Sequence, residues 1–374
     1  MIAKSKTFSV LIPDGENPLL FNVINCLSQI KGIKIYLISS LKENPFKHSR
    51  YIQHYSYYPK AKEEKDWVNN INIELEKFDI DLVMPIFEDG IQALTKYKNL
   101  IYKGRYCVLP SIEDFSIALN KDLLTKHMFN NQIQASKSIV IKPGETFKNE
   151  SINSPFLIKP TSNSGGGVGI VAFSNEKDIE NYFIENKFKI NYLVEEYIEG
   201  YDICCNVLCD KGKILAYTIH KGIMKGGKIY GPSVELLFLY DDQLYKKIVK
   251  LMESLNWYGV ANIDIRYDER AKEFKVIEIN PRFWYNVDAS AIAGVNFPYL
   301  YCLHSLGIDF QEPKYDFIKY LNLNGFIKSV KNNKLAIFNF KFIFSNYQLN
   351  FILKDPLQIF YRVYYVIKRL ILKN

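Results

Sequence analysis

The chain lacks the features that mark secreted, membrane-spanning or disordered proteins. Six cysteines in 374 residues do not make a disulfide framework. No run reaches the ~18 apolar residues that a membrane span requires, and the opening MIAKSKTFSVLIPDG has no long apolar segment of a signal peptide. Internal repeats and low-complexity linkers are absent too. We therefore expect a folded protein of the reduced cytoplasm.

Common catalytic and metal motifs are also missing. The sequence has no serine-hydrolase elbow and no redox motif. Cys204, Cys205 and Cys209 lie close together, but their spacing does not suit a zinc knuckle and no His is nearby in the sequence. We expect buried, reduced thiols on a strand.

Acidic residues are scarce in one region only, the last 62 residues. The segment 313–374 carries eleven Lys and Arg against two acids, Asp316 and Asp355, which gives +9. Since the whole chain is +8, the first 312 residues sum to about −1. The basic character therefore belongs to the tail, which needs its own explanation.

The first hundred residues alternate strand and helix patterns. Nearly continuous apolar strands separated by helices indicate a parallel, doubly wound α/β sheet. Such sheets bind ligands at the carboxyl edge, where Asp14, Glu88 and Asp89 would lie, although turn or capping roles suit them equally. The expected strands are 8–12, 33–39, 80–85 and 106–109, and the expected helices are 17–30 and 89–97.

The following segment predicts one helix over 112–130 and then a series of strands. The expected strands are 138–141, 155–160, 170–173, 192–198, 203–209, 214–220, 260–267 and 274–279. The strands 155–160 and 170–173 are joined by a glycine-rich loop, unlike the strand-to-helix loops of Rossmann and P-loop proteins.

That loop contains Ser164, Gly165, Gly166, Gly167 and Gly169. Glycines allow the backbone to approach a polyphosphate and to direct N–H groups toward it. Lys159, on the strand before the loop, would add positive charge. A glycine-rich hairpin taken alone is also typical of a plain turn.

The segments 259–268 and 274–282 predict a metal site. Glu278 and Asn280 share one strand face, and Asp264 on the neighbouring strand can face both. Two carboxylates and an amide oxygen suit Mg²⁺, and Arg282 can clamp a phosphoryl group. The alternative is a hairpin with solvent-facing charges.

The segment 194–202 predicts a strand that ends in a hinge. The backbone of Glu195, Glu196, Tyr197 and Ile198 could pair with a purine edge, and Asp202 could bind ribose hydroxyls. By itself this segment could be any strand end.

In their order, these motifs resemble the ATP-grasp superfamily, and most of all the carbamoyl-phosphate-synthetase-like carboxylate–amine ligases. The resemblance covers roughly residues 5–308. Its most specific part is VIEINPRFW at 276–284, placed after the strand with Asp264, followed by FLIKPTSNSGGGVGI and YLVEEYIEG.

The resemblance implies a role for each motif residue. Lys121, with Lys126 as competitor, and Lys159 would be the nucleotide lysines, and Ser164–Gly169 the phosphate-covering loop. Glu195–Ile198 would hold adenine and Asp202 the ribose. The implied metal ligands are Asp264, Glu278 and Asn280, and the implied residue over the γ-phosphate is Arg282.

It also implies an α/β N-terminal lobe at 1–112, the two α+β lobes of an ATP-grasp fold at 113–195 and 196–312, and an extension at 313–374. Mg²⁺ or Mn²⁺ would accompany ATP. The expected activity is ADP-forming ligation of a small or glycan-linked carboxylate to an amine. A kinase- or carboxylase-type member and a silent ATP-binding scaffold at a membrane are the alternatives. No nucleic acid is expected, and a homodimer is a further option.

One segment departs from the family pattern, and in a second the residue that would contact phosphate is undecided. Tyr285 and Asn286 stand where a small residue is usual and could reshape the acceptor pocket. In 220–228 several Lys and His residues could face phosphate, or be solvated loop cations.

The tail combines apolar and basic residues. The run 357–372 is strongly apolar and is interrupted by Arg362, Lys368 and Arg369, with Phe338, Phe340, Phe342 and Phe344 upstream. It predicts an interfacial amphipathic element at the inner face of a membrane. Folding back onto the enzyme and an oligomer interface remain equal alternatives.

Overall fold

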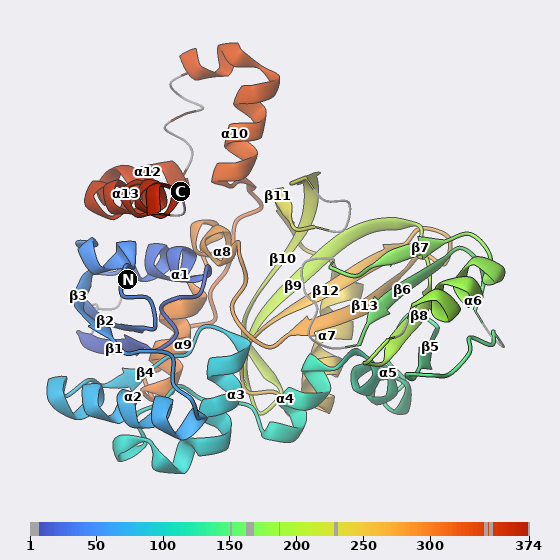
Figure 1. Cartoon of the computed structure of the whole chain (residues 1–374), viewed down its shortest axis with the longest axis horizontal. Coiled ribbons are helices and arrows are strands. Elements are labelled where there is room, and N and C mark those ends of the chain that lie inside the picture. Colours follow the sequence, from blue (N-terminus) through green and yellow to red (C-terminus); the bar gives the residue numbers. More distant parts are fainter. Residues whose placement is uncertain are drawn as a thin grey trace.

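The computed structural model describes residues 7–149, 152–161, 168–186, 188–227, 231–339, 343 and 347–372. The chain forms an N-terminal lobe around a parallel sheet of strand order β3-β2-β1-β4 (Figure 1). Its strands are β1 (Phe8–Ile12), β2 (Ile33–Ser39), β3 (Ile52–Tyr57) and β4 (Leu82–Val83). Its helices are α1 (Leu20–Ser28), η1 (Pro45–His48), α2 (Glu64–Phe78), α3 (Glu88–Tyr97), η2 (Lys98–Leu100) and η3 (Tyr102–Gly104).

The parallel α/β sheet predicted from the sequence is confirmed, with two differences. The edge strand β3 was not expected, because it reads IQHYSY and lacks a continuous apolar run. Helix α2, which follows it, was not expected either. The predicted strand at 106–109 is reduced to a single parallel bridge between Val83 and Tyr106.

The next lobe is small and antiparallel, with strand order β5-β8-β6-β7. Its elements are α4 (Ile112–Leu119), α5 (Lys121–Asn130), β5 (Ser138–Ile141), β6 (Phe156–Pro160), β7 (Val171–Phe173), α6 (Glu176–Glu185) and β8 (Tyr192–Glu196). The single helix expected over 112–130 is wrong. It breaks at Asn120, whose backbone is extended and whose side chain caps α5 by accepting from the Asp122 N–H at 3.2 Å.

The third lobe is built on a sheet of order β13-β12-β9-β10-β11-β14, antiparallel throughout. Its strands are β9 (Gly200–Asp210), β10 (Lys213–Lys225), β11 (Ser233–Leu239), β12 (Gly259–Asp268), β13 (Glu273–Asn280) and β14 (Lys319–Leu321). Its helices are α7 (Asp242–Ser254), α8 (Val287–Ala293) and α9 (Phe297–Ser305). β14 lies within the segment 313–374 but pairs with β11, so the start of the basic tail completes this sheet.

The segment 220–228, in which several Lys and His residues could face phosphate, is strand as far as Lys225. His220 is buried in it, and burial lowers the pKa of this imidazole to about 4. The interpretation of His220 as a solvated loop cation is therefore wrong, because this side chain is buried on a strand and a buried imidazole is neutral at pH 7.

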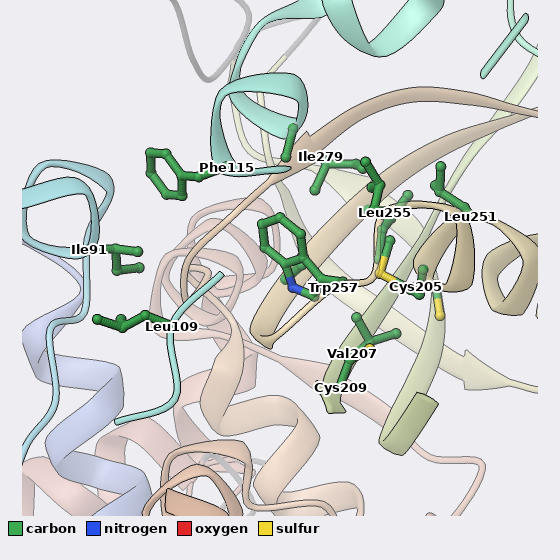
Figure 2. Close-up of a cluster of buried hydrophobic side chains, with 14 of the residues drawn as sticks. Ile91, Leu109, Phe115, Cys205, Val207, Cys209, Leu251, Leu255, Trp257 and Ile279 are labelled. Carbon is green, nitrogen blue, oxygen red and sulfur yellow. The ribbon is translucent and has the colours of Figure 1, made fainter. Parts of the chain in front are cut away.

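One hydrophobic cluster packs the N-terminal lobe, α4 and the large sheet together, whereas the antiparallel sheet of the small lobe has a cluster of its own. Trp257 is fully buried next to Cys205 and Cys209 of β9 and to Phe115 of α4 (Figure 2). Ile91 of the N-terminal lobe belongs to the same cluster. Because shared packing of this kind resists relative movement, helices α4 and α5 are fixed against the large sheet.

The tail continues with α10 (Leu323–Asn332), η4 (Lys334–Phe338), α12 (Tyr347–Lys354) and α13 (Pro356–Leu372). α10 projects away from the body, whereas α12 and α13 return to the N-terminal lobe near α1 (Figure 1). Among the described residues, no helix is both long and apolar enough to cross a membrane.

Candidate active site

Two acids face each other across the β12–β13 ladder. Asp264 and Glu278 are opposite residues in this antiparallel pair. Asn280 donates from Nδ2 to Asp264 Oδ2 at 3.2 Å and to Glu278 Oε1 at 3.4 Å. The Cys204 thiol, on the neighbouring β9, donates to Asp264 Oδ1 at 3.1 Å. The three residues predicted as metal ligands therefore lie together on one face of the sheet.

The electrostatics of the acid pair suit a divalent cation. Burial, followed by the nearby charge of Glu278, raises the pKa of Asp264 to about 7. An added positive charge between the two carboxylates would remove that repulsion. Within the described ranges no cluster of three or more His, Cys, Asp and Glu side chains is arranged for a metal. The two carboxylates are oxygen ligands of the kind Mg²⁺ takes, whereas the Asn280 amide faces them with its nitrogen and would have to rotate to offer its oxygen.

Two lysines of the small lobe bring positive charge toward the acid pair, and one of them, Lys121, contacts it. Lys121, the first residue of α5, places Nζ 3.0 Å from Glu278 Oε2. Lys159 of β6 is almost completely buried and pairs with Glu195 Oε2 of β8 at 2.7 Å. Burial alone would raise the pKa of Glu278, but the charges of Lys121 and Lys159 outweigh it and hold that pKa below its usual range. Lys126, the competitor of Lys121, is exposed on the same helix.

Arg282 connects this group to the N-terminal lobe. Its Nε lies 2.9 Å from Glu88 Oε1, at the start of α3, and its Nη2 donates to Asn280 Oδ1 at 3.0 Å. The guanidinium also lies over the Phe87 ring at 5.3 Å. Glu88 was singled out in the sequence only as a sheet-edge acid, and its pairing with Arg282 was not foreseen.

The predicted hinge is held by ion pairs that the sequence analysis missed. Glu196 accepts from Lys275 at 2.9 Å. Asp202 accepts from Arg266 Nη1 at 2.6 Å and is also paired with Lys225. The register of the ladder could have indicated one of these pairs, because Arg266 is the cross-strand partner of Asp202.

Backbone groups of the hinge are also bonded within the chain. The Tyr197 N–H donates to the Pro155 carbonyl at 2.8 Å. Arg266 donates from Nε to the Ile198 carbonyl at 2.6 Å and from Nη2 to the Gly200 carbonyl at 3.0 Å. The bond to Ile198 occupies part of the backbone that the sequence predicts for a purine edge.

The phosphate-covering loop lies mostly outside the described residues. This applies to Ser164, Gly165, Gly166 and Gly167. Gly169 is described, with a φ of +78°, and a Cβ there would lie 3.0 Å from the Pro160 ring. Gly169 is thus suited to a close return of the chain onto β6.

Other candidates have structural partners. Asp14 is buried and accepts from the N–H groups of Ile86 and Phe87, both at 2.9 Å, while burial raises its pKa to about 7. The carbonyl of Tyr285 accepts from Asn22 of α1, and Asn286 donates to the Ser233 carbonyl at 3.2 Å. The loop after Arg282 is thereby tied to the N-terminal lobe on one side and to β11 on the other.

Solved structures show which fold this arrangement belongs to. The N5-carboxyaminoimidazole synthetase from Staphylococcus aureus, complexed with ADP, is 15% identical, with a TM-score of 0.66 over 89% of this chain and 88% of that one. The L-amino acid ligase from Bacillus licheniformis is also 15% identical, with a TM-score of 0.59 over 84% of this chain and 76% of that one. The fold is that of the ATP-grasp enzymes.

Parts of the sequence are also similar to known proteins. Residues 189–324 match the family described as ATP-grasp in the biosynthetic pathway with Ter operon. The D-alanine–D-alanine ligase of Wolbachia pipientis wMel is 28% identical over 234 residues, which is 58% of this chain and 72% of that protein. The carbamoyl phosphate synthase large chain of Methanothermobacter thermautotrophicus is 25% identical over 227 residues, 56% of this chain and 21% of that one. The predicted resemblance to the ATP-grasp superfamily is confirmed.

Proposed function

We propose that this chain is an ADP-forming ligase that activates a carboxylate as an acyl phosphate and joins it to an amine or similar nucleophile. One observation carries the proposal. Lys121 and Lys159 from the small lobe converge with Asp264, Glu278 and Arg282 from the large sheet. The names of the similar proteins, which include two amino-acid ligases and a carbamoyl phosphate synthase, support the same chemistry.

Asp264, Glu278 and Asn280 would hold Mg²⁺ or Mn²⁺. The cation would supply neutralisation of the phosphate charge. The raised pKa of Asp264 supports this assignment, since a carboxylate pair is relieved by a bound cation.

The cationic side chains bind and orient the reacting groups. Lys121 and Lys159 would neutralise nucleotide phosphates, and Arg282 would hold the transferred phosphoryl group. A carboxylate oxygen attacks the γ-phosphorus, and the bond from phosphorus to the ADP oxygen breaks. The nucleophile then attacks the acyl carbon, and phosphate leaves. Neither step requires a protein nucleophile, so positioning, charge neutralisation and exclusion of water are the work of the site.

Nucleotide binding requires exchange of existing contacts. In this proposal the backbone of Glu195, Glu196, Tyr197 and Ile198 holds adenine, and Asp202 binds ribose. Asp202 already accepts from Arg266 and Lys225, so the ribose would have to share or displace one of these cations.

The test is ADP and phosphate release from the purified protein with Mg-ATP. Pooled carboxylates, with both small and glycan-linked acids, are crossed with pooled amines. Glu278→Gln should reduce release by about 100-fold or more, because it removes one of the two carboxylates that would hold the cation at the reacting phosphate. Glu253→Gln, an exposed acid on α7, is the matched control and should leave release unchanged.

The outcomes separate the alternatives. Release that needs one carboxylate pool and one amine pool establishes a ligase and begins to identify its substrates. Release that needs only bicarbonate with an acceptor indicates the carboxylase type, and phosphorylation of an alcohol indicates the kinase type. ATP binding without turnover in every pool, the same in Glu278→Gln, would indicate the scaffold. Light scattering of the same sample tests the homodimer.

A further inference from the structure

The C-terminal helices are anchored on the N-terminal lobe. Phe351 of α12 packs edge-on against Phe21 of α1, with ring centroids 5.1 Å apart. Asp355, between α12 and α13, is buried and accepts from the Ser49 hydroxyl at 2.6 Å and from the Arg50 N–H at 3.1 Å. This part of the tail therefore has a fixed seat on the enzyme.

α13 uses its polar and aromatic side for this contact. Gln358 is only 2% exposed, and Tyr365 is also buried. The His48 ring of η1 stacks on Tyr361 with centroids 3.4 Å apart and lies within 3.1 Å of the Tyr365 hydroxyl. Lys368 forms an ion pair with Glu43. The seated residues recur at helical spacing along one side of α13.

The opposite side of α13 is apolar and exposed. We call its residues the outer stripe, and their exposed fractions run from 47% for Tyr364 to 63% for Phe360. An amphipathic helix on a globular protein normally buries its apolar side and exposes its polar side. Here the arrangement is reversed, so the apolar side is left for another surface. The outer stripe consists of Leu357, Phe360, Val363, Tyr364, Val366 and Ile367.

The charge around the outer stripe favours an anionic partner. Between 347 and 372 the acid in the sequence is Asp355, which is buried against Ser49. Lys354 is exposed at the end of α12, Arg362 is exposed on α13 with its guanidinium 5.8 Å from the Phe21 ring, and Arg369 adds to the basic sequence. A second copy of this chain would bring like charges together, whereas anionic lipid headgroups would meet them with opposite charge.

We propose that α13 lies flat on an anionic lipid bilayer, with the outer stripe in the headgroup and acyl boundary and the opposite side on the N-terminal lobe. Aromatic and aliphatic side chains flanked by Lys and Arg are typical of helices that bind a bilayer without crossing it. The surface is separate from the group around Glu278, so this inference does not depend on the ligase activity.

The test is co-sedimentation of the full chain with phosphatidylcholine vesicles, with and without phosphatidylglycerol. The wild-type protein should bind the phosphatidylglycerol vesicles and should bind less as salt rises. Phe360→Glu/Ile367→Glu should lower the partition coefficient by about tenfold or more, because two apolar anchors are lost. The matched control is Phe129→Glu/Ile184→Glu, which changes the same residue types at exposed positions of α5 and α6.

The remaining outcomes overturn the proposal. The proposal is overturned if the wild-type protein binds neither kind of vesicle. It is also overturned if the stripe variant and the control variant lose vesicle binding to the same extent. Concentration-dependent dimerisation in light scattering that the stripe variant abolishes, without vesicle binding, would assign the stripe to a second copy. Thermal unfolding of each variant verifies the fold, and the substituted side chains are half exposed or more, so melting temperatures close to wild type are expected.

Discussion

Separate changes to the Lys159–Glu195 pair should distinguish its structural role from its role in catalysis. The two side chains are 4% and 7% exposed and lie 2.7 Å apart. Because water does not reach them, each charge is compensated by the other. Lys159→Met leaves the Glu195 carboxylate buried without its partner. Glu195→Leu leaves the ammonium in the same position. Each single change should lower the free energy of opening of the small lobe by about 3–5 kcal/mol.

The double variant should behave differently in stability and in activity. Lys159→Met/Glu195→Leu removes both charges, and a buried pair replaced by apolar side chains is often neutral or stabilising by about 1–4 kcal/mol. Stability should therefore return to near the wild-type value. ADP release should stay low, since the lysine that neutralises phosphate is still missing.

Hydrogen exchange of peptides from β6 and β8 measures the opening free energy of this lobe directly. Lys246→Met is the control, because Lys246 forms a pair of equal length, 2.7 Å, with Asp242 on the exposed side of α7. That change should have no measurable effect. The reasoning would be refuted if the double variant were as unstable as the two single changes together, or if it regained full ADP release.

Three further predictions concern stability. Burial raises the pKa of Asp288 from 3.8 to about 6, so the folded state favours the protonated carboxyl. The stability that this group contributes is fully present below about pH 4 and is lost as the pH rises through about 6. In urea unfolding, the free energy of unfolding should fall by about 3 kcal/mol between pH 4 and 7 because of this group, and Asp288→Asn should lack that part of the fall. The same pH dependence in wild type and Asp288→Asn would contradict the prediction. Asp355→Ala removes the acceptor of the Ser49 hydroxyl and of the Arg50 N–H, so hydrogen exchange in α13 should show an opening free energy lower by about 1–3 kcal/mol, and unchanged protection would argue against the anchor. Gly200→Ala places a Cβ 1.9 Å from the Tyr267 carbonyl oxygen at a φ of +148°, and calorimetry should show a loss above about 1 kcal/mol; a wild-type melting temperature would disprove the clash.

Much of the fold could be predicted because the strands carry strong local patterns. The apolar runs at 8–12 and 33–39 place the parallel sheet, and the alternation in 274–280 puts Glu278 and Asn280 on one face. The edge strand at 52–57 was missed because polar residues interrupt it. The break at Asn120 was missed because it rests on one residue, whose extended backbone ends α4 and whose side chain caps the start of α5.

The candidate site could be predicted in its residue types but not in its pairings. Local spacing indicated that Asp264 faces Glu278, since both lie on adjacent strands whose alternation is visible in the sequence. Nothing local indicated that Arg282 meets Glu88, 194 residues away, because that contact depends on how the N-terminal lobe packs against the large sheet. The partners of Asp202 were missed too, although the pairing of β12 with β9 could have indicated Arg266.

The tail shows the same division between local pattern and packing. The sequence by itself determined that 357–372 is amphipathic and basic, because apolar pattern and charge are local properties of the segment. It left open whether the tail folds back on the enzyme. Tertiary structure decided that the helix is seated, and that Gln358, Tyr361 and Tyr365 face the enzyme while Phe360 and Ile367 face outward. The side that packs is chosen by long-range partners such as His48, and these are brought near only by the complete fold.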